Sequence, residues 1–500
     1  MKSRFLRVLT ASLLIVIAGC DNELDITDDW RETPVVYSLL NPNTSQNYIR
    51  LQRAYLGEGN AYLMGQYSDS LYFDTNRVSV RVIRVKTTGA FDTVYCPVTT
   101  DIRKDEGVFA DAPHYLYEHI GRLFSDSRYQ LLVNRHIPVG SKTVTSLENG
   151  IFDPSGSNRQ FIMLVKNSEL QEASLKEGNL LHSLGFVASG VLPNANYSVS
   201  VSATPVNGCL NPSALPSFTT VLNSEVMLLN NGWNDIFFKT TFAVPSGSDI
   251  AFRICINPQN GAGAAALSFT ETPGCVTFAA SATCGSGTAA ISETKRPVIR
   301  LGYSGNGVNN RITFAETELV ANFSSPTLST ITSINLANSE PYRIKCVSSK
   351  NAALQGLEAR FRYLERKINT PNFVEKSVIY PLGTVTPSTT NGGELFEFLM
   401  SGDAFFQYLA SQIPNDPTVT RPANAVKIDF IAKIGTLGFY TYYVVNQPGN
   451  SVYNQPEYTN IENGKGIFTC RLDSTRSNYQ LNSPSTDSLN FGRFTGNLFN

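Results

Sequence analysis

Residues 78–85 read VSVRVIRV, with a valine or isoleucine at almost every second position. In an extended chain Val78, Val80 and Val82 lie on one face and Arg81 lies on the other. Branching at the β carbon favours a strand over a helix. The stretch therefore predicts a β-strand with one buried face.

The segments around this strand have a similar pattern. Short alternating runs are separated by Asn, Pro and Gly, and the chain is 11% aromatic but only 16% charged. Regularly spaced strands joined by such turns are typical of a β-sandwich. The strands predicted in this part of the chain are 35–40 (VVYSLL), 48–56 (YIRLQRAYL) and 129–135 (YQLLVNR).

The composition changes between 149 and 306. Four of the eight cysteines and a Gly/Ala/Ser-rich run at 261–290 fall here. Strands are predicted at 197–205, in two parts of 232–256, and at 295–304. A β-sandwich inserted into a loop of a host domain explains the shift, because surface loops tolerate insertions.

After residue 306 the sequence again resembles the first 148 residues in composition. LEARFRYLER at 357–366 predicts a half-exposed strand, with an amphipathic helix as the alternative, and 396–400, 425–435 and 438–447 also predict strands. Ser401 or Asp403 could cap a helix with the face Phe406, Leu409 and Ile413, which Pro414 would end.

The predicted fold class is all-β. It has two β-sandwich units of immunoglobulin-like or jelly-roll type, one inserted in the other, and one or two short helices near the C-terminal third. The predicted parts are a signal peptide (1–19), an acidic tether (20–32), a host domain (33–148 and 307–478), an inserted sandwich (149–306) and a flexible tail (479–500).

Residues 1–20 read MKSRFLRVLTASLLIVIAGC, with the basic residues Lys2, Arg4 and Arg7 near the start. An apolar run at 8–17 follows and is too short to cross a bilayer. Its end, Ile17-Ala18-Gly19-Cys20, resembles a bacterial lipobox. The resemblance implies cleavage before Cys20 and lipid attachment to its sulfur. The alternative is an ordinary secretory signal with a chance cysteine.

The acidic run DNELDITDD at 21–29 predicts a solvated tether. It also resembles the surface-export signal of Bacteroidota lipoproteins. We therefore expect a lipid-anchored protein of the outer membrane, facing the cell exterior, with the periplasmic leaflet as the alternative.

Four cysteines are crowded together in the sequence, and an exported protein meets an oxidising compartment. Cys275 could pair with Cys284 across a short loop, and Cys209 could pair with Cys255. Free buried thiols and a zinc site are the alternatives, although the sequence has no CxxC motif and only His182 lies nearby.

Several long segments resemble uncharacterised Bacteroidota outer-membrane lipoproteins, which are similar to a family found near SusC/SusD-like transport systems. The resemblance covers about 30–145 and 310–475 and supplies no catalytic residue. The segments that carry it are 34–61 (PVVYSLLNPNTSQNYIRLQRAYLGEGNA), 68–73 (SDSLYF), 348–366 (SSKNAALQGLEARFRYLER), 402–413 (GDAFFQYLASQI) and 453–468 (YNQPEYTNIENGKGIF).

The middle segment resembles the jelly-roll modules of secreted adhesin-like proteins. That resemblance independently suggests an insert where the composition changes. The residues that match its pattern are Gly232, Trp233, Asn234, Cys255, Arg296 and Pro297.

Motifs of catalysis are scarce in the sequence. His114 and His119 are five residues apart and do not form HExxH, and neither GxSxG nor a phosphate-binding GxxxxGK[ST] loop occurs. Glycosidase carboxylates can be far apart in sequence, so a hydrolase stays open. We expect no enzymatic activity, no metal and no cofactor.

A tyrosine-rich region predicts either an aromatic binding surface or sandwich core. Its members are Tyr440, Tyr442, Tyr443, Tyr453 and Tyr458. The net charge of −1 gives no electrostatic attraction to nucleic acid, so no nucleic-acid partner is expected.

Three functions remain. The first is a non-catalytic binding or accessory module for an extracellular glycan, a protein or an outer-membrane complex, including a TonB-dependent or secretion-type barrel. The second is a structural subunit of a transport or secretion machine, and the third is a glycan hydrolase. A concave strip of exposed Tyr and Trp would favour the first, a flat apolar patch the second, and facing carboxylates in a cleft the third.

Overall fold

The computed structural model describes residues 32–54, 61–105, 107, 109–125, 127–140, 146–148, 160–192, 196–210, 215–259, 266–271, 278–281, 284, 290–292, 295–388, 392–446 and 457–499. The predicted signal peptide, Cys20, the tether, Cys275 and Tyr453 lie outside these ranges. Within them, no helix is long and apolar enough to cross a membrane.

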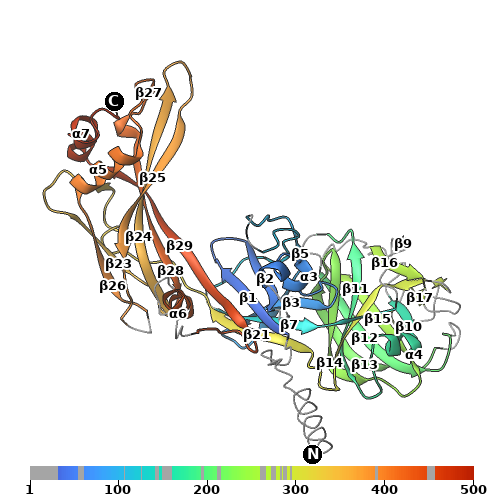
Figure 1. Ribbon diagram of the computed structural model, residues 1–500. Coiled ribbons are helices and arrows are strands. Elements are labelled where there is room, and N and C mark those ends of the chain that lie inside the picture. Colours follow the sequence, from blue (N-terminus) through green and yellow to red (C-terminus); the bar gives the residue numbers. More distant parts are fainter. Residues whose placement is uncertain are drawn as a thin grey trace, which may run out of the picture.

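The fold is all-β, as the alternating pattern predicts, and its largest sheet has ten strands in the order β25-β24-β28-β29-β1-β2-β6-β5, with β22 and β27 at its sides. Figure 1 shows this sheet running from the C-terminal part of the chain into its N-terminal part. Its strands are β1 (Thr33–Leu40), β2 (Gln46–Ala54), β5 (Val98–Thr99), β6 (Leu116–Ile120), β22 (Ser333–Ile334), β24 (Ala352–Lys367), β25 (Val374–Thr384), β27 (Val419–Thr420), β28 (Lys427–Thr436) and β29 (Lys465–Leu481).

A four-stranded sheet shares a hydrophobic core, which we call the first core, with the large sheet. The strand that contains VSVRVIRV is central in it, and Val78, Val80 and Val82 are buried as the alternation predicts. The four strands, in order, are β21 (Arg311–Glu318), β7 (Ser127–Arg135), β3 (Val78–Lys86) and β4 (Phe91–Cys96).

The C-terminal part of the first core is covered by a strand pair and by helices. The predicted strand at 357–366 is part of β24, and the helix predicted after Ser401 is present with Phe406, Leu409 and Ile413 buried. These elements are β23 (Tyr342–Val347), β26 (Leu395–Met400), α5 (Gly402–Gln412), η1 (Ala423–Ala425), α6 (Leu437–Val445) and α7 (Ser483–Phe491), and shorter helices elsewhere are α2 (Ala61–Met64), α3 (Ser68–Leu71) and α4 (Asn167–Glu172).

Two further sheets enclose a second core, whose buried residues all lie between Val139 and Leu301. One has the order β13-β12-β15-β10-β17-β18, and the other has β19-β16-β11-β20-β8 with β14 and β9 at its sides. Their strands are β8 (Ile137–Val139), β9 (Ser146–Glu148), β10 (Gln160–Val165), β11 (Leu180–Ser189), β12 (Asn196–Val206), β13 (Thr219–Leu228), β14 (Gly232–Ala243), β15 (Asp249–Gln259), β16 (Ala266–Glu271), β17 (Phe278–Ser281), β18 (Ala290–Ser292), β19 (Lys295–Pro297) and β20 (Ile299–Ser304).

The chain enters and leaves the second core between two strands that are already neighbours. β7 precedes it, β21 follows it, and the two pair antiparallel in the four-stranded sheet. The Arg135 N–H donates to the Asn310 carbonyl at 2.7 Å, and β8 pairs with β20 directly beyond that point. β8 and β9 precede the predicted boundary at 149, but they pair with β20 and β16 in a sheet of the second core.

Two predicted local structures are wrong. The aromatic segment 438–447, predicted as a strand, forms α6 over most of its length. The Thr436 side chain accepts a hydrogen bond from the Phe439 N–H at 3.1 Å, which is a helix N-cap. A Cβ on Gly435 would lie 2.5 Å from the Phe439 ring, so the glycine makes room for this turn. Local capping thus outweighs the strand preference of Tyr, Phe and Val.

The tail predicted to be flexible from 479 is instead structured: β29 continues to Leu481, and α7 follows it. Asn482 caps α7 by accepting from the Ser485 N–H at 3.1 Å. Leu489 and Phe499 are buried in the first core, where the Phe499 ring centroid lies 5.8 Å from that of Phe361. Short helices are present near the C-terminal third as predicted, and its described residues contain α5, η1, α6 and α7.

Candidate functional site: a pocket at the junction and an aromatic surface

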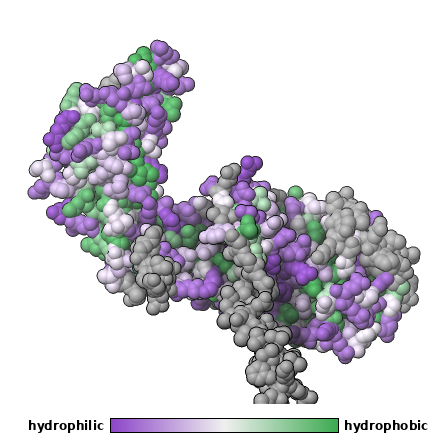
Figure 2. All heavy atoms as spheres, viewed as in Figure 1, coloured by the Kyte–Doolittle hydropathy of each residue, from purple (hydrophilic) through white to green (hydrophobic). Residues whose placement is uncertain are grey.

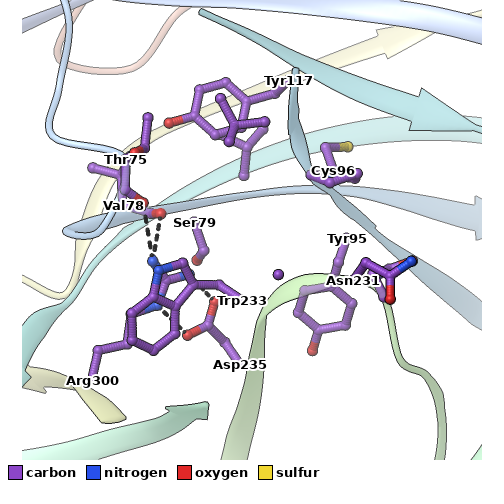
Figure 3. A pocket seen from close by; sticks show the side chains of 15 residues that line it. Thr75, Val78, Ser79, Tyr95, Cys96, Tyr117, Asn231, Trp233, Asp235 and Arg300 are labelled. Atoms are coloured by element: carbon purple, nitrogen blue, oxygen red, sulfur yellow. Dashed lines mark hydrogen bonds and ion pairs between the residues drawn. The ribbon is translucent and has the colours of Figure 1, made fainter. Parts of the chain in front are cut away.

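A pocket of about 150 Å³ lies where the two cores meet. Figure 3 shows that its walls come from both sides of the junction. Tyr95 and Tyr117 come from β4 and β6, and Trp233, Asp235 and Arg300 come from β14 and β20. We call it the junction pocket. The other residues that line it are Thr75, Val78, Ser79, Val80, Cys96, Pro97, Val98, Asn230, Asn231 and Gly232.

The base of the junction pocket is a buried ion pair. Arg300 of β20 binds both carboxylate oxygens of Asp235 on β14, from Nε to Oδ1 at 2.8 Å and from Nη2 to Oδ2 at 2.5 Å. Its remaining nitrogen, Nη1, donates to the carbonyl oxygens of Thr75, Asn76 and Val78 at 3.1 to 3.2 Å. The Arg300 guanidinium therefore connects β14 and β20 of the second core to β3 and to the loop that precedes it.

Charges within the network decide its protonation. Burial by itself would raise the pKa of Asp235, but the adjacent Arg300 charge outweighs it and the pKa is lowered. Burial lowers the pKa of His136 to about 3. The negative charge of Asp235 acts to raise this pKa, whereas the positive charges of Arg300 and Arg81 act to lower it. Asp235 is therefore ionised and His136 is neutral at pH 7.

Two tyrosines in the pocket stay protonated. Burial raises the pKa of Tyr95 to about 12 and raises the pKa of Tyr117 as well. The ring of Tyr95 is stacked with that of Phe237 at 6.3 Å, and Arg81 lies over the Phe237 ring at 3.5 Å. The wall on this side is thus held by aromatic and cation–π contacts.

Trp233 lies half-buried at this pocket. Its indole N–H donates to the Asn76 side-chain oxygen at 3.0 Å, and the Arg300 guanidinium lies 4.5 Å from its ring centre. Both contacts fix the orientation of the indole. The turn before it is fixed too, because Asn234 exchanges two side-chain hydrogen bonds with the Asn230 backbone.

The predicted tyrosine-rich region is brought together around α6. Tyr440, Tyr442 and Tyr443 lie on the helix, and a Cβ on Gly438 of α6 would lie 2.8 Å from the Tyr458 hydroxyl. Among the described members, Tyr443 is the most exposed, at 52%. The helix packs against β24, β28 and β29 through Phe439. The tyrosines therefore lie partly in the core and partly on the surface.

The exposed side of α6 continues onto β1. The rings of Tyr37 and Tyr442 meet edge to face at 6.4 Å, and burial together with Tyr37 raises the pKa of Tyr442. Tyr37 is 39% exposed and Leu39, which points the same way on the strand, is 42% exposed. We define the aromatic surface as Tyr37, Leu39, Tyr440, Tyr443 and Val444. Figure 2 shows further hydrophobic side chains on the C-terminal part of the chain.

The cysteines differ from the predicted pairing. Cys255 forms a disulfide with Cys284, with the Cα atoms 5.7 Å apart. The predicted pairs Cys275–Cys284 and Cys209–Cys255 are therefore both wrong. Cys209 is also in a disulfide, and Cys275 lies outside the described residues. Cys255 is buried on β15, and sequence proximity alone could not show which loop the fold brings against it. Cys96, Cys346 and Cys470 are buried free thiols whose pKa values are raised by burial.

The histidines are dispersed over the structure. His119 on β6 is buried, with its pKa lowered by burial, and His114 lies in the preceding loop, where its ring bonds the Ile102 carbonyl at 3.0 Å. The described residues contain no group of three His, Cys, Asp or Glu side chains that could hold a metal ion.

Sequence reasoning missed the Asp235–Arg300–His136 network. The available signal was the charge placed inside otherwise apolar strands, in RPVIRLG at 296–302 and WNDIFF at 233–238. Charged residues are rarely buried unless they are paired. The signal marks each residue as unusual but cannot name its partner, which is 65 residues away.

Neither a protein-family pattern nor a characterised protein matches the sequence. Among solved structures, similarity is found to the clostridial cysteine protease Cwp84 after propeptide cleavage, at 11% identity over 56% of this chain and 73% of that chain, with a TM-score of 0.24. A second structure, of the cysteine protease and lectin-like domains of Cwp84 from Clostridium difficile, has 10% identity, 55% and 64% coverage and a TM-score of 0.21.

The FN1–FN3 domains of chicken CNTN1 are similar at 9% identity over 81% of this chain and 92% of that chain, with a TM-score of 0.11. At these TM-scores the comparisons assign neither a family nor a function. The function is therefore argued from the residues themselves.

Proposed function

We propose that the chain is a surface lipoprotein, anchored to the outer membrane through Cys20, that works as a binding module and contacts a protein partner through the aromatic surface. The single observation that carries the binding role is the exposure of that surface on two packed elements, α6 and β1. Tyr443 and Val444 are 52% and 39% exposed on the helix, beside the exposed Tyr37 and Leu39 of the strand.

The physical argument rests on exposed apolar area and rigidity. A contiguous group of apolar side chains in water favours association, and aromatic residues supply much of the binding energy of protein interfaces. The side chains here are held before binding, because Phe439 stacks with Tyr443 at 6.5 Å and Tyr37 packs on Tyr442. Little conformational entropy is then lost when a partner covers them.

The proposed class of partner is an outer-membrane protein assembly. This choice is supported by the lipobox-like Cys20 and by the resemblance of 34–61 and 453–468 to lipoproteins found near SusC/SusD-like systems. A lipid anchor confines the chain to the membrane surface, which raises the effective concentration of a membrane partner.

The experiment has two parts. Cys20→Ala should release the protein from the membrane fraction, and retention there would refute the anchor. In the second part, the tagged lipoprotein is purified from its own outer membrane in mild detergent, and the co-purified proteins are identified by mass spectrometry. A stoichiometric outer-membrane partner is expected.

Substitutions then test the surface itself. Val444→Lys and Leu39→Lys change two different elements of the aromatic surface, and each should reduce recovery of the partner at least tenfold. The matched control is Leu395→Lys, at an exposed leucine of β26. Equal recovery from all three variants would exclude the aromatic surface as the contact, and recovery of the wild-type protein alone would refute the partner.

A further inference from the structure

We propose that the junction pocket is a second binding site, which takes one neutral pyranose residue of a glycan. The proposal goes beyond the protein contact above, because the junction pocket is built from different residues than the aromatic surface. Its carrying observation is a small cavity with fixed aromatic walls, amide groups at its edge and a charge-balanced base.

Charge selects a neutral ligand. Asp235 and Arg300 are the lining residues that carry full charge at pH 7, and they neutralise each other in a two-bond pair. Each of the three guanidinium nitrogens already donates a hydrogen bond, to Asp235 or to the three carbonyl oxygens. An anionic or cationic ligand would lose its hydration without gaining a counter-charge, which is costly in a buried site.

The aromatic residues fit the apolar face of a sugar ring. Trp233, Tyr95 and Tyr117 all line the cavity, as Figure 3 shows. The indole of Trp233 is held by Asn76 and by Arg300, so it presents a fixed surface with no rotamer to freeze. A pyranose has a flat face of C–H groups and a rim of hydroxyls. The aromatic walls of the pocket match the flat face, and the polar groups at its edge match the hydroxyls.

Polar groups at the edge fit the hydroxyls. The Asn231 side-chain oxygen accepts the Val191 N–H at 3.0 Å, which orients the amide and leaves its N–H donors for a ligand. Thr75 and Asn230 also line the cavity, and the Asn230 backbone is fixed by the side chain of Asn234. Amides and hydroxyls both donate and accept, as the alternating hydroxyls of a neutral sugar require.

Size limits the ligand to one ring. The cavity volume of about 150 Å³ is well below the range of roughly 300–1,000 Å³ typical of sites for drug-sized molecules. A glycan would therefore insert one terminal or side-branch residue, with the rest of its chain outside. One such contact is weak, and we expect millimolar affinity for a monosaccharide.

The protein has two tryptophans, Trp30 and Trp233, so one substitution gives a direct reporter. In the full-length Trp30→Phe protein, Trp233 fluorescence is titrated with the methyl glycosides of glucose, galactose, mannose and N-acetylglucosamine, and with glucuronic acid. At least one neutral glycoside should give a saturable change, and glucuronic acid should give none. The proposal is overturned if no neutral glycoside gives a saturable change in Trp233 fluorescence, or if glucuronic acid binds more tightly than the neutral glycosides.

A variant that narrows the cavity tests the location. Val98→Phe adds bulk at an exposed lining residue of β5 without touching the ion pair. It should weaken glycoside binding at least tenfold, whereas the matched control Leu395→Phe on β26 should leave binding unchanged. Undiminished binding in Val98→Phe would place the sugar elsewhere. Since Val444→Lys leaves the junction pocket intact, failure of the partner pull-down and failure of this titration are separate results.

Discussion

Asp235 and Arg300 form a buried, doubly hydrogen-bonded ion pair at the junction of the two cores, with contacts of 2.8 and 2.5 Å. Because the same guanidinium also binds three carbonyl oxygens of β3 and the loop before it, the pair is a structural link between the units as well as the base of the junction pocket. Its removal affects both stability and the shape of the pocket.

Arg300→Met should destabilise the protein by about 3–5 kcal/mol, because it leaves the Asp235 carboxylate buried without a partner. The measurement is the free energy of unfolding in urea, followed by fluorescence. Glu397→Ala, which breaks the exposed Arg343–Glu397 pair of β23 and β26, is the control and should cost no more than about 1 kcal/mol. Similar losses in the two variants would refute a special role for the buried pair.

His136 should make the protein acid-sensitive. Its pKa is about 3 in the folded chain against an ordinary value of 6.5, so the unfolded chain binds more protons between these pH values. His136 therefore does not reduce the free energy of unfolding above pH 6.5. Between pH 6.5 and pH 3 it lowers that free energy by up to about 1.4 kcal/mol for each pH unit.

His136→Gln removes this titration and should flatten the pH dependence of the urea midpoint between pH 6 and pH 4. Below the ordinary pKa of 3.8, protonation of Asp235 should still lower the stability of the variant. The groups that face His136 are Ser79, Ser183, Asp235, Arg81 and Arg300, and of these Asp235 is the carboxylate. An unchanged slope in the variant would show that other groups cause the acid sensitivity.

Peptide mapping without reduction should recover a cross-linked pair that contains Cys255 and Cys284. The bond closes a loop of 29 residues, so replacing both cysteines by serine should lower the free energy of unfolding by about 3–4 kcal/mol. A peptide that links Cys275 to Cys284 would contradict the pairing described above.

Gly466→Ala should be strongly destabilising. This residue lies at the start of β29 with φ +93°, and a Cβ there would lie 2.0 Å from the Val36 carbonyl oxygen of β1. We expect a loss above about 3 kcal/mol in thermal or urea unfolding, since backbone strain alone costs about 1–3 kcal/mol. Gly89→Ala is the matched control, because Gly89 has φ +81° and open space around it. Equal losses would mean that the contact with Val36 relaxes freely.

The strand pattern could be predicted from sequence because alternation is local. Val78, Val80 and Val82 share a buried face, and β28 likewise buries Ile428 and Phe430. The predictions at 438–447 and 479–500 failed where capping and distant packing decided the structure. Thr436 and Asn482 start helices, and Phe499 is held by Phe361, which is more than a hundred positions away in the sequence.

The sites were less predictable than the fold. The tyrosines around α6 were identified, but Tyr37 and Leu39 join the aromatic surface through β1, far away in the sequence. The junction pocket is formed by β3, β4, β5, β6, β14 and β20 together, and the spacing of residues along the sequence does not show that these strands meet. Trp233 stands out in the sequence, but only the fold places it beside Arg300 and Asn76.

The position of the second core between β7 and β21 has a consequence for how such a chain can change. Those strands are hydrogen-bonded neighbours, so a short hairpin could replace everything between Arg135 and Asn310 without altering the strand order of the four-stranded sheet. The second sandwich can thus be treated as an exchangeable cassette: relatives could lose it, or carry another in its place, while the first core and the aromatic surface keep their architecture.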